Sequence, residues 1–144
     1  MATRVENNDF AGEWTLTGNE KMEELLAAVG VSWIKRKAGS AIGYGVGKVK
    51  QSVSQDGDVI TVDQKGGQRD FVSIVKADGM AAQTDSPDGM APVTATWALD
   101  GSLVMQTEFM GCKVTVTRRR IDDKTTVMII DTGKVAAKRT FTKQ

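Results

Sequence analysis

The stretch VTVTRRRIDD, from Val114 to Asp123, alternates apolar and polar residues in the pattern of a β-strand with one buried face. In such a strand, Arg118 and Arg120 share a face with Val116. A face that carries valines is expected to point into the protein core. The sequence therefore predicts that two arginines follow the valines on the inner face of a strand.

The last strand-like segment, KVAAKRTFT from Lys134 to Thr142, repeats this pattern. Arg139 falls on the same face as Val135 and Phe141. An arginine that is buried without a partner destabilises a protein by several kcal/mol. Two explanations stay open. Either the arginines pair with a buried carboxylate or extend to a barrel rim, or they line a cavity and bind an anionic ligand there.

Turn signals separate these and other β-rich segments at a regular spacing of roughly 10–12 residues. Asp-Gly and Gly-Gly pairs are typical of tight hairpin turns, because they tolerate a positive φ. Short strands at this spacing indicate an antiparallel meander, either in a sandwich or in an up-and-down barrel. The signals are Asp56-Gly57, Gly66-Gly67, Asp78-Gly79, Asp88-Gly89, Asp100-Gly101, Met110-Gly111, Asp122-Asp123-Lys124 and Thr132-Gly133.

One segment interrupts this rhythm, with apolar residues at the i, i+3, i+4, i+7 spacing of an α-helix. We expect this helix to have Asn19 as its N-cap and to end at Gly30. A second short helix is expected to begin after Ser32 and to run through Ala38. The predicted order is one strand, two helices and about nine further strands. The apolar positions of the first helix are Met22, Leu25, Leu26 and Val29.

The length and composition are those of a single globular domain. The chain has 144 residues, so residues 1–144 are expected to form one domain. The apolar fraction is 40% and the formal charge is +1, which argue against a dedicated nucleic-acid-binding protein. The N-terminal stretch MATRVENNDF has no apolar segment of the kind that a secretory signal needs, and no apolar run approaches the length of a membrane span.

Cys112 is the only cysteine, and the chain has no histidine. A single cysteine excludes an intrachain disulfide and favours a reducing compartment, so a cytoplasmic location is expected. The lack of histidine removes the common catalytic triads and the histidine metal sites. We therefore expect that the chain is not an enzyme and that it binds neither a metal nor a cofactor.

Several segments carry a resemblance to a known family. FAGEWTL (residues 10–16) is similar to an opening barrel strand, and EELLAAVGVSWIKRKAG (23–39) is similar to a helical lid. TVTRRRIDDK (115–124) and KRTFTK (138–143) are similar to late strands of the same barrel. On these segments the chain resembles the intracellular lipid-binding proteins, which include the fatty-acid-binding and cellular retinoid-binding proteins. The resemblance extends over essentially the whole chain.

The resemblance implies an all-β fold, namely a ten-stranded antiparallel up-and-down β-barrel of the calycin type, with a two-helix lid after the first strand. The family holds a lipid in the barrel cavity, where its carboxylate meets an Arg-x-Tyr motif on the last strand and an arginine two strands earlier. By matching motif, Arg139 and Arg118 take these places, while Phe141 stands where the family has tyrosine. The other expected ligand contacts are Trp33, Val116 and Met22.

The expected function is that of a monomeric cytoplasmic carrier that binds a long-chain fatty acid. Two kinds of alternative stay open: another hydrophobic acid, such as a retinoid, a bile acid or a tetrapyrrole like bilirubin, or a secreted lipocalin-like binder. The basic triplet Lys35, Arg36 and Lys37 is expected to touch anionic membranes transiently. No nucleic acid is expected as a partner.

Overall fold

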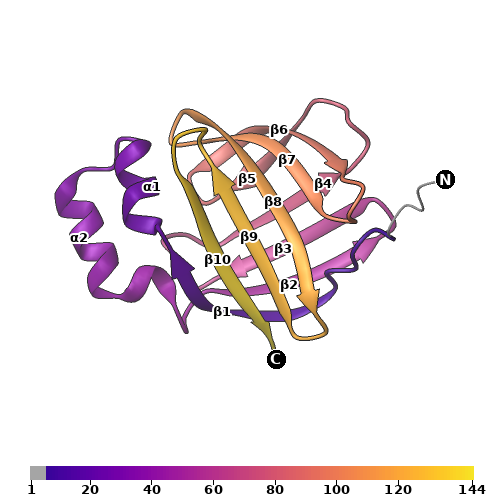
Figure 1. Cartoon of the computed structure of the whole chain (residues 1–144), viewed down its shortest axis with the longest axis horizontal. Coiled ribbons are helices and arrows are strands. Elements are labelled where there is room, and N and C mark those ends of the chain that lie inside the picture. The colour runs from indigo at the N-terminus through magenta and orange to yellow at the C-terminus, as the bar shows by residue number, and fades with distance from the viewer. Residues whose placement is uncertain (1–5) are drawn as a thin grey trace.

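The computed structural model describes residues 6–144, which form a barrel of ten antiparallel strands with two short helices at one end (Figure 1). The predicted fold class and the order of one strand, two helices and nine strands are confirmed. The first five residues, MATRV, belong to the stretch used to argue against a secretory signal and lie outside the described residues. The helical elements are α1 (Met22–Ala28), α2 (Trp33–Ala41) and the 3-10 turn η1 (Gly43–Gly45), and the strands are β1 (Gly12–Glu20), β2 (Lys50–Asp56), β3 (Val59–Lys65), β4 (Phe71–Lys76), β5 (Ala82–Ser86), β6 (Gly89–Trp97), β7 (Leu103–Phe109), β8 (Cys112–Asp122), β9 (Thr125–Asp131) and β10 (Ala136–Lys143).

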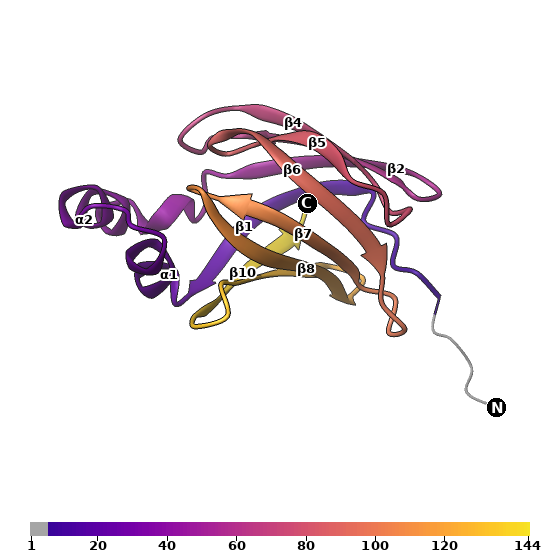
Figure 2. The ribbon, with the colours of Figure 1, turned by 90° about the horizontal axis from the view of Figure 1, so that it is seen from above.

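A single sheet wraps around the molecule in the order β4-β3-β2-β1-β10-β9-β8-β7-β6-β5. Each pair joins strands that are consecutive in the chain, except the pair that joins β1 to β10. Seen from above in Figure 2, the strands surround the interior and the helices lie beyond one end of it. The sheet leaves β4 and β5 as its two edges, so the backbone ladder of the barrel is open only between them.

The predicted turn signals all lie at junctions between consecutive strands, as expected from their local chemistry. At the β6–β7 junction, the Asp100 carboxylate accepts a hydrogen bond from the Ser102 amide at 2.9 Å. Gly101 has a φ of +85°, and a Cβ there would lie 2.2 Å from the Glu6 carbonyl oxygen. This turn therefore requires glycine both for its backbone conformation and for its contact with the N-terminal segment.

The start of the lid differs from the expectation. Asn19 is not the N-cap of α1, because β1 continues to Glu20 and Asn19 pairs with Arg139 of β10. The residue at the cap is Lys21, which has a left-handed φ of 61° and no side-chain cap hydrogen bond. Long-range pairing with the last strand thus takes precedence over the local capping preference of asparagine.

The second helix begins as expected, since the Ser32 hydroxyl accepts a hydrogen bond from the Lys35 amide, but it continues past Ala38 to Ala41. Arg36 donates to a Glu23 carboxylate oxygen at 2.9 Å and to the Val31 carbonyl at 2.6 Å. Arg36 therefore joins α2 to α1, whereas its neighbours Lys35 and Lys37 are exposed. The expected contact of this basic triplet with anionic membranes stays a prediction.

The end of the barrel that lies away from the lid is closed by aromatic residues and by Arg120. Phe10 and Trp14 have no exposed surface, and the Trp14 indole N–H donates to the Phe10 carbonyl at 2.9 Å. The Arg120 guanidinium lies 5.7 Å from the Trp14 ring centroid and donates to the carbonyl oxygens of Asp9 and Asp123. The second arginine of the opening stretch therefore ties the N-terminal segment to the β8–β9 turn.

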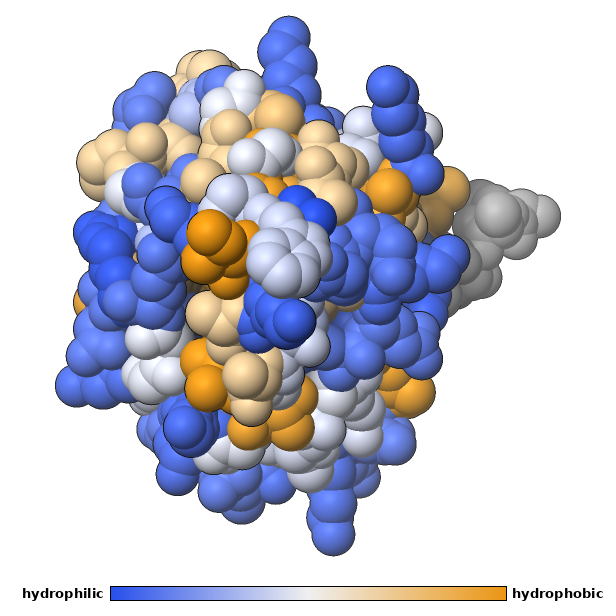
Figure 3. Space-filling view, turned by 90° about the vertical axis from the view of Figure 1, so that its left-hand side faces the viewer, coloured by the Kyte–Doolittle hydropathy of each residue, from blue (hydrophilic) through white to orange (hydrophobic). Residues whose placement is uncertain are grey.

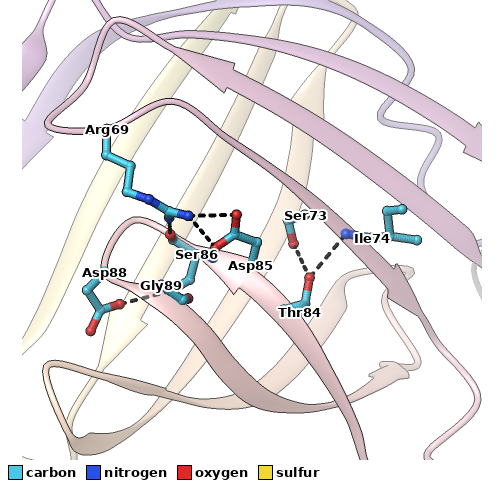
Figure 4. A network of polar contacts seen from close by, with 8 residues as sticks. All are labelled: Arg69, Ser73, Ile74, Thr84, Asp85, Ser86, Asp88 and Gly89. Carbon is cyan, nitrogen blue, oxygen red and sulfur yellow. Dashed lines mark hydrogen bonds and ion pairs between the residues drawn. The ribbon is translucent and has the colours of Figure 1, made fainter.

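Side chains bridge the gap between the edge strands β4 and β5, as Figure 4 shows. Arg69, which precedes β4, donates to both carboxylate oxygens of Asp85 on β5, each at 2.8 Å. The hydroxyl groups of Ser73 and Thr84 lie 2.9 Å apart, and the Ile74 amide donates to the Thr84 hydroxyl at 3.1 Å. The Thr84 hydroxyl thus accepts the Ile74 N–H, which has no neighbouring strand on this side of β4 to bond to.

Replacing Thr84 with valine is expected to loosen this gap. Valine has nearly the same shape but cannot accept the Ile74 N–H, so we expect unfolding free energy to fall by about 1–2 kcal/mol. Amide hydrogen exchange at Ile74 should accelerate at the same time. Thr96→Val, at an exposed position of β6, is the matched control and should change neither quantity appreciably. Equal exchange rates at Ile74 in the two variants would contradict this role.

Candidate functional site

The Arg118 side chain lies inside the barrel with an incomplete set of partners. It is 2% exposed, and its Nη1 donates only to the sulfur of Met128, at 3.6 Å. Its Nε and Nη2 have no hydrogen-bond partner among residues 6–144. Among residues 6–144, no carboxylate forms an ion pair with it, so of the two explanations for buried arginines, pairing within the fold does not apply to Arg118.

Burial changes the energetics of this guanidinium. Loss of solvation lowers the pKa of Arg118 to about 10, so the group is still protonated at neutral pH. The rings of Phe10 and Phe141 lie 5.3 Å and 5.8 Å from the guanidinium carbon, and their faces offset a small part of the desolvation cost. Arg118 therefore remains a buried cation that lacks an anion.

A pair of glutamines, which the sequence reasoning missed, lies in the same interior. Gln51 of β2 and Gln64 of β3 are 3% and 7% exposed, and the Gln51 amide donates to the Gln64 carbonyl oxygen at 2.9 Å. The Gln51 amide also approaches the Met128 sulfur, at 4.0 Å. Strand alternation could have revealed both residues, because Gln51 lies two positions before the buried Val53 and the alternating pattern of β3 places Gln64 inward as well.

Arg139 lies two strands from Arg118, and both residues pair across the ladders with Met128 on β9. Its Nε donates to the Asn19 side-chain oxygen at 3.1 Å, and its Nη2 donates to the Tyr44 carbonyl at 2.9 Å. Burial lowers the pKa of Arg139 to about 10. Arg118 and Arg139 thus lie on either side of Met128 in the sheet. Arg139 also binds the segment that follows the lid, through the Tyr44 carbonyl.

The other predicted ligand contacts lie in three different environments. Val116 is 9% exposed and follows the same inner face of β8 as Arg118. Met22 is buried with Leu25 and Ala137 in a cluster where α1 packs on the barrel. Trp33 is 61% exposed on α2 and lies outside the barrel. The ligand contacts of these three residues stay predictions.

The outer face of α2 combines apolar and basic residues. Ile34 is 74% exposed next to Trp33, and the Lys37 ammonium lies 4.8 Å from the centroid of the Trp33 ring. Figure 3 shows this side of the molecule, where hydrophobic residues are surrounded by hydrophilic ones. Such a mixture of exposed aliphatic, aromatic and cationic groups suits contact with a lipid surface.

The interior is closely packed around the unpartnered polar groups. Each unpartnered nitrogen of Arg118 exposes less than 1 Å². A molecule that binds these nitrogens must therefore displace a neighbouring side chain. Met128 is the best candidate, because it already contacts Nη1 and because a thioether side chain is flexible and changes rotamer readily.

An open hollow of about 500 Å³ lies along β6 to β9. Its lining includes the polar residues Thr94, Gln106 and Thr115 as well as the buried Val93 and Val114. Arg118 is not among the lining residues, so this hollow is separate from the site around Arg118.

Within residues 6–144, no cluster of three or more carboxylate, cysteine or histidine side chains could hold a metal ion. No helix in the described part of the chain has the length and apolar character needed to cross a membrane.

Comparisons with known proteins agree with this architecture. No protein-family model matches the chain. Fatty acid-binding protein 5 of Pygoscelis papua is 29% identical over 119 residues, which cover 82% of this chain and 84% of that protein. The adipocyte fatty acid-binding protein of the same species is 25% identical over 134 residues, which cover 93% of this chain and 96% of that protein.

Solved structures share the fold at lower sequence identity. The REP1-NXSQ fatty acid transporter has a TM-score of 0.76 and 20% identity, and the match covers 94% of this chain and 96% of that chain. A tyrosine-to-phenylalanine mutant of that transporter has a TM-score of 0.75 and 20% identity, with coverage of 94% and 98%. These relatives are named as binding proteins and transporters, which agrees with the prediction that the chain is not an enzyme. Relatives along most of the chain and the shared ten-stranded barrel therefore confirm the predicted resemblance to the intracellular lipid-binding protein family.

Proposed function

We propose that this chain is a cytoplasmic carrier that binds a long-chain fatty acid inside the barrel, with the carboxylate held by Arg118 and Arg139. The observation that carries the proposal is the buried Arg118 guanidinium, which has free donors and no carboxylate partner. A ligand carboxylate would supply two acceptor oxygens for these donors. The names of the relatives, which are fatty acid-binding proteins and fatty acid transporters, support the same ligand class.

The affinity would come from two sources. Burial of the acyl chain contributes a gross ~0.8 kcal/mol per methylene group. The inner surface offers an apolar lining for it, including Leu16, Val93 and Leu103. Desolvation of the carboxylate, ordering of the chain and displacement of side chains offset much of this gross gain. The ion pair with Arg118 then decides whether an acid is preferred over a neutral lipid of the same length.

The two arginines would contribute unequally. Arg118 has unpartnered Nε and Nη2 groups, so a carboxylate there costs no existing hydrogen bond except the weak one to Met128. Arg139 already donates to Asn19 and to the Tyr44 carbonyl. A carboxylate that reaches Arg139 has to share it with these groups. We therefore assign the larger share of head-group binding to Arg118.

Transient contact with anionic membranes is part of the proposal. The exposed Trp33 and Ile34 would insert their apolar surface, while Lys35 and Lys37 would meet lipid phosphate groups. Arg36 would take no direct part, because Glu23 already neutralises it.

Replacing Arg118 with methionine provides the principal test. Affinity for a fatty acid should fall by about 2–5 kcal/mol, because the ligand carboxylate loses its cation, while affinity for the alcohol of the same length should change far less. The unliganded variant should be more stable than the parent, since an unpaired buried charge is removed. Calorimetry with both ligands and a denaturant titration measure the two effects.

Arg119→Met is the matched control, because Arg119 lies on the same strand but is exposed and lies 3.9 Å from Asp100. It should leave the affinities for acid and alcohol unchanged. Equal losses of acid and alcohol binding in Arg118→Met would mean that the arginine shapes the interior without binding the head group. Retinoids, bile acids and bilirubin belong in the same titration, since the same cation would suit any of them.

Reversing both exposed lysines of α2, as Lys35→Glu with Lys37→Glu, should slow ligand transfer to vesicles that contain anionic phospholipid by roughly tenfold, because each cation near such a surface contributes about 1 kcal/mol. Transfer to neutral vesicles should change little. The control pair, Lys76→Glu with Lys124→Glu, carries the same change of charge at the other end of the barrel. Membrane contact through α2 is refuted if both pairs slow transfer equally.

A further inference from the structure

The Gln51 amide is a buried group with one polar atom left over. Its Oε1 has no hydrogen-bond partner in the described part of the chain and exposes less than 1 Å². Its Nε2, by contrast, donates to Gln64 and approaches the Met128 sulfur. An unpaired buried acceptor is costly, so its presence in a closely packed interior calls for a donor from outside the chain.

Both neighbours of the Gln51 amide nitrogen are hydrogen-bond acceptors. Gln64 presents its carbonyl oxygen to Gln51 at 2.9 Å, and the Met128 thioether can only accept. Both contacts therefore need an N–H group, which places the Gln51 nitrogen between them. The unpaired atom of Gln51 is consequently its carbonyl oxygen, which needs a donor.

Gln51 of β2 and Arg118 of β8 both lie next to the Met128 side chain. The Arg118 Nη1 and the Gln51 Nε2 both reach the Met128 sulfur, at 3.6 Å and 4.0 Å. A thioether is a weak acceptor for two donors. A molecule that displaces Met128 would therefore meet the Arg118 guanidinium and the Gln51 amide together. The unpartnered atoms of these two groups are the Nε and Nη2 donors of Arg118 and the Oε1 acceptor of Gln51.

A simple fatty acid satisfies only half of this arrangement. Its carboxylate accepts from Arg118, but it is ionised at neutral pH and has no hydrogen to donate to Gln51. A hydroxyl group on a carbon close to the carboxylate would provide that hydrogen.

We propose that the preferred ligand is a hydroxylated long-chain fatty acid, with its hydroxyl group at the α or β carbon. Arg118 binds the carboxylate and the Gln51 Oε1 accepts the hydroxyl hydrogen, while Gln64 holds the Gln51 amide in position. This inference rests on the proposed function, because it assigns the carboxylate to Arg118.

The test compares a saturated long-chain acid with its α-hydroxy and β-hydroxy derivatives of the same length, by calorimetry. With the parent protein, one hydroxy acid should bind about 5- to 10-fold more tightly than the plain acid, the effect of one buried hydrogen bond. In Gln51→Met, which has a similar size and no oxygen, this order should reverse. The hydroxyl group then loses its water without gaining a partner, while the plain acid no longer faces an unpaired oxygen.

Gln83→Met is the matched control, because Gln83 is exposed on β5 and pairs with Pro92 in the ladder. It should keep the preference of the parent protein. Thermal melting of each variant confirms that it is folded. A misfolded Gln51→Met would weaken all the acids together, whereas the proposal requires the plain acid to keep its affinity or to gain.

Other results would overturn the inference. Equal binding of plain and hydroxy acids by the parent protein would mean that displaced side chains or a buried water satisfy Gln51. A preference that persists in Gln51→Met would place the hydroxyl group elsewhere. Two other results would refute the proposed function itself: no binding of any acid by the parent protein, or equal losses of acid and alcohol binding in Arg118→Met. Either result would refute this inference as well.

Discussion

Pairing of the first strand with the last is the constraint on which the site depends. Because β1 joins β10, all ten strands form one continuous sheet that wraps around the interior, and side chains bridge its open edge between β4 and β5. In an open sheet, the arginine on the valine face of β8 would reach solvent. The same pairing places Leu16 opposite Phe141 and Asn19 opposite Arg139, so closure also builds the apolar lining and anchors the second arginine. The same strand pairing therefore builds the barrel and positions the side chains of its interior.

Unpartnered polar groups in this interior destabilise the unliganded protein. Arg118 is a buried cation without an anion, and Gln51 keeps an unpaired oxygen beside it. Each arrangement costs free energy in the unliganded protein, and apolar packing around Trp14 and Phe141 has to offset that cost. Polar groups that a fold holds at such a cost are characteristic of binding sites, where a ligand completes the hydrogen bonds. In the structure, the sulfur of Met128 is only a weak acceptor for Arg118.

A chain of contacts connects this interior to the lid. Arg139 donates to the Tyr44 carbonyl, and the Tyr44 hydroxyl donates to Glu23 on α1, which also binds Arg36 of α2. The hydrogen bonds from Tyr44 and Arg36 hold the pKa of Glu23 below its usual value, while the bond to Glu23 raises the pKa of Tyr44. Tyr44 itself has a left-handed φ of 51°, a conformation that costs free energy in a residue other than glycine. These contacts hold the two helices over one end of the barrel.

Local patterns in the sequence determined the strands, the turns and the inward position of Arg118, because alternation and Asp-Gly chemistry act between near neighbours. Tertiary structure alone decided what surrounds that arginine. Met128 is its partner in the adjacent strand, but Gln51 lies far away along the chain, and only the barrel brings Gln51 to the same methionine. The local preference of Asn19 is for a helix cap, and only its pairing with β10 places it in a strand. Arg36 looked like a free cation until folding placed Glu23 beside it, since side-chain partners depend on distances in space that a sequence does not contain.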